Sequence, residues 1–174
     1  DVHGSRGLGD VYKRQSSSST VYTATFTPTA DSTTDGVISV ASSKFSDSAG
    51  NENADGSDSN NTLTLSVDTV RPTIAITSGA SSLKAGETTT VTFTLSEAAS
   101  DFIEGDISVS GGSLSSFAAS SSTVYTATFT PTADSTTDGV ISVASSKFSD
   151  SAGNENADGS DSNNTLTLSV DTVR

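Results

Sequence analysis

Apolar and polar residues alternate in several short stretches of the chain, and most of the polar positions are threonine or serine. In Thr90–Leu95 every second residue is apolar, and in Val124–Phe129 a Tyr, an Ala and a Phe fall on one face in the same way. Successive side chains of a strand point to opposite faces, so this pattern predicts strands that bury one face. No stretch repeats its apolar residues with the 3.6-residue period of a helix. The sequence therefore predicts an all-β protein.

Residues 72–174 contain about seven such stretches, separated by turns rich in Gly, Pro, Asp and Asn. The expected strands and apolar anchors are Thr73–Thr77, Thr90–Leu95, Ile107–Val109, Leu114 with Phe117, Val124–Phe129, Gly139–Val143 and Leu166–Val170. Lys84–Glu87 is expected to be a turn. Seven short alternating strands in about 100 residues are typical of a two-sheet Greek-key sandwich.

An internal repeat sets the domain organisation. Residues 17–71 are identical, position by position, to residues 120–174, so the repeat has a period of 103 residues. A unit of about 100 residues has the size of a domain. Residues 72–174 are thus one complete repeat, whereas 17–71 form only the back half of a preceding copy. We expect 72–174 to fold alone, and 17–71 to be loosely packed or to borrow strands from another molecule, because its apolar faces lack a facing sheet.

Residues 1–16 stand apart from this repeat. Residues 1–15 match nothing else in the chain, and the run Asp10–Gln15 looks like a translated sequencing adapter. A native linker is the alternative. This segment is left out of the fold prediction.

Composition and charge exclude several classes of function. The chain has 8 basic and 21 acidic residues and a net charge of −13, whereas a nucleic-acid groove needs Lys and Arg. It contains no Cys, so it has no disulfide and no thiolate zinc site, and with one His, at position 3, no His-based triad or His-rich metal site is expected. No apolar run approaches the roughly 20 residues of a membrane helix, and no signal peptide is visible. The acids lie in expected loops with no apolar pocket to raise a pKa, so no enzyme activity is expected.

Six motifs of the chain resemble the bacterial Ig-like repeats of large secreted adhesins. They are Val67–Thr73, Leu83–Glu87, Val91–Glu97, Gly105–Gly112, Tyr125–Pro131 and Asp150–Asn154. The resemblance covers 72–174 and the half copy 17–71. It implies an Ig-like sandwich that serves as a tandem extender domain of a bacterial surface or RTX-type adhesin, located outside the cell and often stiffened by calcium.

The positions of the acids in such a sandwich predict a calcium site. Loops of an Ig sandwich alternate between its two ends, and one end would gather acids from the linker, from the loop between the second and third strands and from the last hairpin loop. Converging carboxylates repel each other, and calcium accepts six to eight oxygen ligands. The expected centre of this interdomain site is Asp68, Asp101, Glu104 and Asp106, with help from Asp31, Asp35 or Asn154. The same end also carries Glu97, Asp150 and Glu155. Alternatively, these acids are solvated loop charge that keeps a secreted chain soluble.

The expected function is that of a spacer that projects an adhesive tip from the cell surface. Its expected partners are neighbouring identical repeats, with a surface glycan or host protein bound through other domains of the parent protein. The alternative is a module whose own loops bind a glycan or host surface. Such a module should expose aromatic side chains, and Phe102, in the acidic loop, is the candidate.

Overall fold

The computed structural model describes residues 9–16, 20–55, 58–158 and 161–174, with the backbone alone for 9–16. Two compact units make up the chain: Asp1–Val70, here called unit 1, and Arg71–Arg174, here called unit 2.

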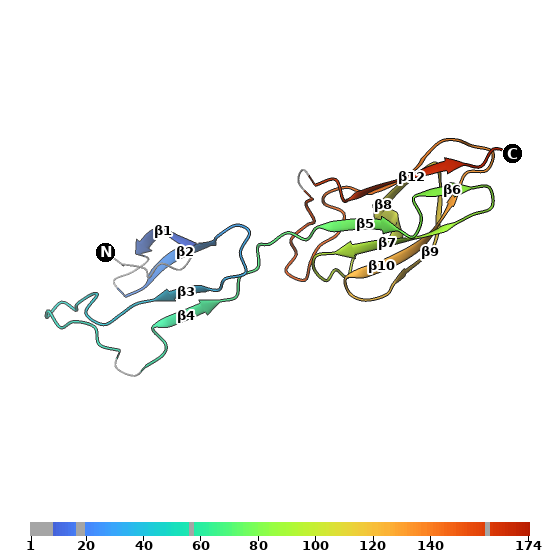
Figure 1. Cartoon of the computed structure of the whole chain (residues 1–174). Helices are drawn as coiled ribbons and strands as arrows, with labels where there is room; N and C mark the ends of the chain where they lie inside the picture. Colours follow the sequence, from blue (N-terminus) through green and yellow to red (C-terminus); the bar gives the residue numbers. More distant parts are fainter. Residues whose placement is uncertain (1–8, 17–19, 56–57, 159–160) are drawn as a thin grey trace. The chain divides into compact units, whose positions relative to one another are not determined.

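Among its described residues, unit 2 contains eight strands and one turn of 3₁₀ helix (Figure 1). The strands are β5 (Ile74–Ser78), β6 (Ser82–Lys84), β7 (Thr89–Leu95), β8 (Ile107–Ser110), β9 (Gly112–Ala119), β10 (Val124–Pro131), β11 (Gly139–Val143) and β12 (Thr165–Asp171), and the helical turn is η1 (Glu104–Asp106). The alternating stretches expected to be strands all lie within or overlap these elements. The short β6 was not predicted.

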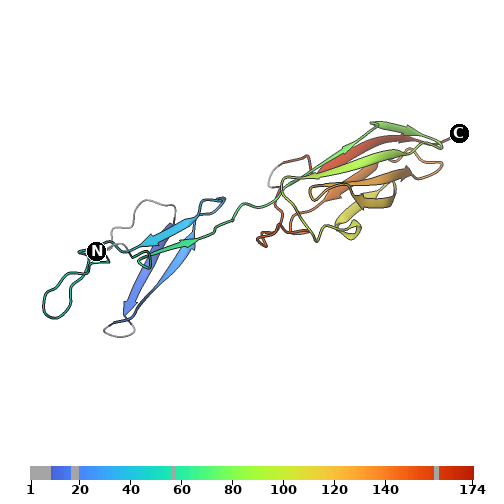
Figure 2. The same ribbon diagram turned by 90° about the horizontal axis from the view of Figure 1, so that it is seen from below.

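The strands of unit 2 form two four-stranded sheets, in the orders β5-β7-β10-β9 and β6-β12-β11-β8, which can be followed in Figures 1 and 2. The chain passes from one sheet to the other after β5, β6, β7, β8 and β10. The pairs are antiparallel except for β6 with β12, which run parallel. These connections confirm the predicted all-β, two-sheet Greek-key sandwich.

The inward faces of the two sheets form one apolar core. Its largest fully buried side chains include Phe93, Phe129 and Phe148. Phe102, from the loop after β7, is only 3% exposed and occupies the centre of an aromatic cluster. Its ring centroid lies 5.9 Å from that of Phe93, 5.6 Å from Phe117, 5.1 Å from Tyr125 and 5.3 Å from Phe148. Edge-on ring pairs at such distances are favourable.

One glycine of the core is required by close packing. A Cβ atom on Gly139, the first residue of β11, would lie 2.5 Å from Cζ of Phe129. The Phe129 ring therefore lies against the bare backbone of β11, and a larger residue at 139 would push it out of place.

Unit 1 repeats part of this arrangement. Its strands are β1 (Gly9–Ser16), β2 (Tyr22–Pro28), β3 (Gly36–Ser39) and β4 (Thr62–Leu65). They form two separate two-stranded sheets, β1-β2 and β3-β4. The pairing of Gly36 with Leu65 matches that of Gly139 with Leu168 in unit 2.

The segment set apart from the fold prediction supplies β1. Gly9 lies opposite Pro28 in β2, as Gly112 lies opposite Pro131 in the β9–β10 pair. The remaining partners keep the same offset of 103 residues, including the irregularity in the middle of the strand. The backbone of residues 9–16 thus takes the place in unit 1 that β9 has in unit 2.

Candidate functional site

Three segments of unit 2 meet at one end of the sandwich, as the sequence predicted. The β7–β8 loop reaches the β11–β12 loop through a bridge between Ala99 and Asp150. The β11–β12 loop in turn reaches the start of β5, where the Ala157 amide donates to the carbonyl of Pro72 at 3.0 Å. These contacts place most of the acids of the two loops at a single end.

Two buried polar side chains hold the β11–β12 loop in shape. Asn156 is fully buried, and its Oδ1 accepts from the amides of Lys147 (2.7 Å) and Phe148 (3.2 Å). Its Nδ2 donates to the carbonyl of Ala144 and to Oδ2 of Asp158. These bonds fold the loop back on itself and satisfy a side chain that would be costly to bury alone. Asp158 continues the connection into the sheet, since its Oδ1 accepts from the amide of Ile74 at 2.8 Å.

Asp150 is a buried carboxylate that organises a tight turn. Its Oδ1 accepts from the amides of Ala152 (2.8 Å) and Asn154 (2.9 Å), and its Oδ2 accepts from Nδ2 of Asn154 at 2.8 Å. Burial raises the pKa of Asp150, but the bonds from Asn154 and Ala152 outweigh it and bring the pKa below its ordinary value of 3.8. Asp150 is therefore held as an anion.

Two of the predicted calcium ligands accept backbone hydrogen bonds. Both carboxylate oxygens of Asp101 accept from the amide of Ser149 at 3.0 Å, which joins the two acidic loops. Oδ2 of Asp106 accepts from the amide of Ile103 at 2.9 Å and closes the turn of η1. Glu104 is exposed in that turn.

Of the other predicted ligands, Asp31 and Asp35 belong to unit 1 and are exposed in the loop between β2 and β3. Ser32 of that loop is tied to Thr69, whose Oγ1 accepts from the Ser32 amide at 3.0 Å. Asn154, in unit 2, serves the Asp150 turn. The predicted ligand set stays a prediction.

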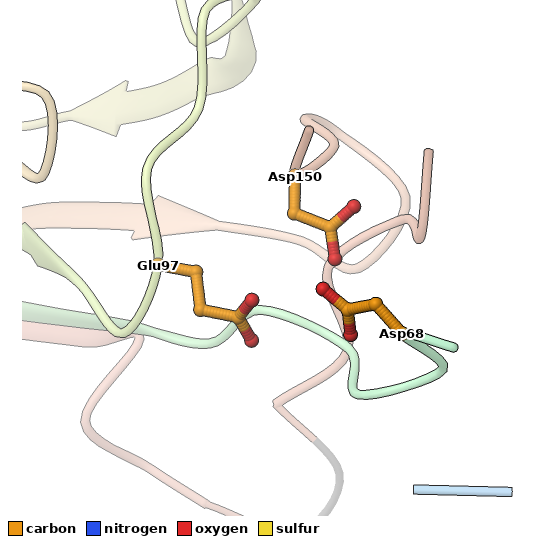
Figure 3. Close-up of side chains that lie close together, drawn as sticks. All are labelled: Asp68, Glu97 and Asp150. Atoms are coloured by element: carbon orange, nitrogen blue, oxygen red, sulfur yellow. The ribbon is translucent and has the colours of Figure 1, made fainter. Parts of the chain in front are cut away.

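A group of three acids stands out among the residues that the structure describes. Asp68, Glu97 and Asp150 each place a carboxylate oxygen so that the three atoms lie within 4.8 Å of one another. Figure 3 shows the three side chains directed toward one another, with Asp68 on the segment that leads into β5, Glu97 just after β7 and Asp150 after β11. Asp68 and Glu97 are partly buried and Asp150 is buried.

This group is chemically suited to a hard cation. Two unit charges 4.8 Å apart repel by about 1 kcal/mol at the dielectric constant of water and by roughly 3.5 kcal/mol at an effective value near 20. A divalent cation reverses the sign of this interaction, and carboxylate oxygens are the ligands that calcium prefers.

The group shares only Asp68 with the predicted centre, while Asn154 bonds directly to one member, Asp150. Glu97 and Asp150 were expected at this end but not chosen as ligands. Two sequence features single them out: Glu97 follows the last inward residue of a strand by two positions, and Asp150 begins an Asp-Ser-Ala-Gly-Asn turn. Glu97 is thus positioned by the end of β7, and Asp150 by its own turn and by the bridge to Ala99.

The sequence of the chain matches a known protein family. A family described as "Bacterial Ig-like domain" matches residues 8–64 and 68–167. No curated protein and no solved structure matches the chain. Among the described residues, no helix has both the length and the apolar character needed to cross a membrane.

Proposed function

Because the chain belongs to the bacterial Ig-like domain family, we propose that it is a spacer module of a bacterial surface adhesin and that calcium stiffens it through the Asp68, Glu97 and Asp150 group. Domains of this family are structural and non-catalytic and commonly occur in surface proteins. The adhesin role, the extracellular location and the calcium ion belong to the proposal.

The observation that carries the calcium part is the convergence of three carboxylates from three separate segments. Glu97 and Asp150 come from the two loops at one end of unit 2, and Asp68 comes from the segment that connects β4 to β5. An ion held by Glu97 and Asp150 would tie the two acidic loops of unit 2 to each other and stiffen that end of the sandwich.

The Asp150 turn supports this use. Hydrogen bonds from Ala152 and Asn154 orient the carboxylate before any ion arrives, so little side-chain freedom remains to be lost on binding. The same bonds lower the pKa of Asp150 and keep it charged at neutral pH. Asp101, Glu104 and Asp106 lie in the neighbouring loop, where they would add to the negative field that attracts a cation.

Calcium titration of the full chain by isothermal calorimetry tests the proposal. We expect binding heat, and a melting temperature of unit 2 that falls when EDTA is added. At free calcium 100 times the dissociation constant, the linkage is worth about 2.7 kcal/mol, or about 10 °C or more for a domain of this size. No binding heat together with a melting temperature unchanged by EDTA would remove calcium from the proposal.

The repeat provides a matched control for the ligand set. Asp47 is the counterpart of Asp150 and forms the same turn with Asn51, but it is not part of the acidic group. Asp150→Asn should weaken calcium binding at least tenfold, while Asp47→Asn should leave it unchanged. Glu97→Gln should also weaken binding, whereas the exposed Glu87→Gln should not. If Asp47→Asn weakened calcium binding as much as Asp150→Asn does, the weaker binding would be due to the shared turn and not to the loss of a ligand from the acidic group.

The alternative function, direct binding of a glycan or host surface, gains no support from unit 2. Its candidate aromatic, Phe102, is buried in the core. The large apolar residues that are exposed in the described part of unit 2 are Ile103 and Val173, neither of which is aromatic. Binding of sugars by stacking needs accessible rings.

A further inference from the structure

The β11–β12 loop ends in a short motif that the proposed calcium site does not use. Residues 161–165 read Asp-Ser-Asn-Asn-Thr and end on the first residue of β12, and residues 58–62 repeat them up to the first residue of β4. Each copy contains an Asn followed two positions later by Thr, with a residue other than Pro between them. This is the acceptor pattern for N-linked glycosylation. The sequence contains it at Asn60 and Asn163, and in both copies an Asp stands two positions before the Asn.

The motif forms the same turn in both copies. The amide of Thr165 donates to the carbonyl of Ser162 at 3.3 Å, so the two asparagines between them are the central residues of a β-turn. The amide of Thr62 donates in the same way to the carbonyl of Ser59 at 3.4 Å. The pattern therefore lies on a surface turn, where an acceptor asparagine is expected.

The two adjacent asparagines of unit 2 have different surroundings. Asn164 serves the fold, since its Nδ2 donates to the carbonyl of Val143 at 3.0 Å and its own carbonyl accepts from the Val143 amide at 3.1 Å. The side chain of Asn163 is exposed, and its Nδ2 donates to Oδ2 of Asp161 at 3.2 Å. The asparagine that the pattern marks as the acceptor is thus the one with room for a large substituent.

Unit 1 shows the same division of roles. Nδ2 of Asn61 donates to the carbonyl of Val40 at 3.1 Å, whereas Asn60 is exposed and its Nδ2 donates to Oδ2 of Asp58 at 3.3 Å. The threonines that complete the two patterns, at positions 62 and 165, are exposed as well. Both groups that define the pattern are therefore accessible on the surface of the folded chain.

We propose that Asn163 and Asn60 are acceptors of an N-linked oligosaccharide, transferred by a bacterial oligosaccharyltransferase that reads the Asp two positions before the acceptor and the Thr two positions after it. The donor is an oligosaccharide linked to a lipid pyrophosphate. Nδ2 of the asparagine forms a bond to the anomeric carbon of the first sugar and loses a proton to solvent. The bond from that carbon to the pyrophosphate oxygen breaks, and the lipid pyrophosphate leaves.

The glycan of unit 2 would be attached beside the edge of a sheet. The carbonyl of Asn163 accepts from the amide of Ile76 at 2.8 Å, and Ile76 belongs to β5, the first strand of its sheet. Exposed edge strands invite pairing with other chains, so a glycan at this position would also hinder association between molecules. The proposal does not depend on the calcium site, because Asn163 and Asp161 are not part of the acidic group.

The test incubates the purified, folded full chain with a purified bacterial oligosaccharyltransferase and a lipid-pyrophosphate-linked oligosaccharide, and then measures the intact mass. We expect the chain to gain two oligosaccharides. Asn163→Gln and Asn60→Gln should each reduce the gain to one, and the double variant should gain none. Both side chains are exposed, so these variants should leave the melting temperature unchanged. No gain in mass, in a reaction that modifies a reference acceptor peptide, would overturn the proposal.

Neighbouring positions provide matched controls, tested in the Asn60→Gln background so that one acceptor remains. Asp161→Asn and Thr165→Ala should each abolish the modification of Asn163, because they remove the groups that the enzyme reads. Ser162→Ala and Thr167→Ala change exposed residues that are not part of the pattern and should leave the gain in mass intact. Equal modification of Asp161→Asn and Ser162→Ala would overturn the role given to Asp161, and equal modification of Thr165→Ala and Thr167→Ala would overturn the assignment of the pattern.

Discussion

At the scale of single residues, the buried polar side chains of the β11–β12 loop decide how the acidic end of unit 2 is built. The side chain of Asn156 makes four hydrogen bonds that hold the loop where no strand pairing does. The carboxylate of Asp150 likewise accepts backbone hydrogen bonds that hold a tight turn. Neither role is visible in the sequence, where both residues belong to a polar loop. Their importance follows from burial, which depends on the path of the whole loop.

Asn156 provides a residue-scale prediction. Asn156→Ala should lower the free energy of unfolding of unit 2 by about 2–3 kcal/mol, because it leaves buried backbone groups without partners. Its counterpart Asn53 makes the same bonds in unit 1, so Asn53→Ala should leave the unfolding transition of unit 2 unchanged. Urea unfolding measures both. Equal effects of the two variants on that transition would contradict the prediction.

Asp150 provides a pH-dependent prediction. Its pKa in the folded protein is lowered below 3.8, so its contribution to stability is complete above that value and is lost as the pH falls through the folded pKa. The stability difference between the wild type and Asp150→Asn should therefore be constant near neutral pH and shrink below about pH 4. Urea midpoints at several pH values, measured in EDTA, test this. A difference that grows on acidification would have the wrong sign.

At the scale of elements, the alternation of apolar and polar residues predicted the strands that bury one face over five or more residues. It did not predict β6, and it marked β9 only in part, because neither has a regular alternation. β6 (Ser82–Lys84) buries one residue, Leu83, so it has no second apolar position with which to alternate. β9 was seen only as Leu114 and Phe117, whose spacing of three breaks the two-residue period. The structure explains this spacing by an irregularity in the β9–β10 register, where Ser116 has a φ of 55°.

The acidic ligands were less predictable than the strands. The shared end of the loops followed from the fold class, but the direction of each carboxylate did not. Asp101 and Asp106 accept from backbone amides within the loops, which depends on local turns. Glu97 lies two residues after β7, whereas Asp150, seven residues after β11, is held by its own turn and by the bridge to Ala99.

The unpredicted strand β6 gives an element-scale prediction. Leu83 is 4% exposed, belongs to the core and lies opposite Val170 in the parallel pair with β12. Leu83→Ala should cost about 2–5 kcal/mol of the stability of unit 2, whereas Lys84→Ala, at the exposed next position, should cost less than about 0.5 kcal/mol. Thermal or urea unfolding measures both. A negligible effect of Leu83→Ala would show that β6 does not help close the sandwich.

At the scale of the whole molecule, one sequence of 55 residues occurs in two settings: in unit 2 it follows β5 to β9, and in the described part of unit 1 it follows only β1, the counterpart of β9. Unit 2 buries an apolar core between two four-stranded sheets, while unit 1 consists of two separate strand pairs. Stability in a small β-domain comes mainly from apolar burial between sheets rather than from isolated pairs. The closed core of unit 2 therefore depends on residues 72–119 and does not follow from the repeated residues alone.

Amide hydrogen exchange followed by NMR tests this dependence most directly. NMR distinguishes the amides of the two copies of the repeat, which have the same sequence and therefore the same peptide masses. In the monomer, the amides of Val140–Val143 should exchange only through unfolding of unit 2, and those of residues 37–40 should exchange at least roughly 100-fold faster. Equal protection of the two sets would contradict the account, because the repeated sequence would then form a stable core without its preceding strands.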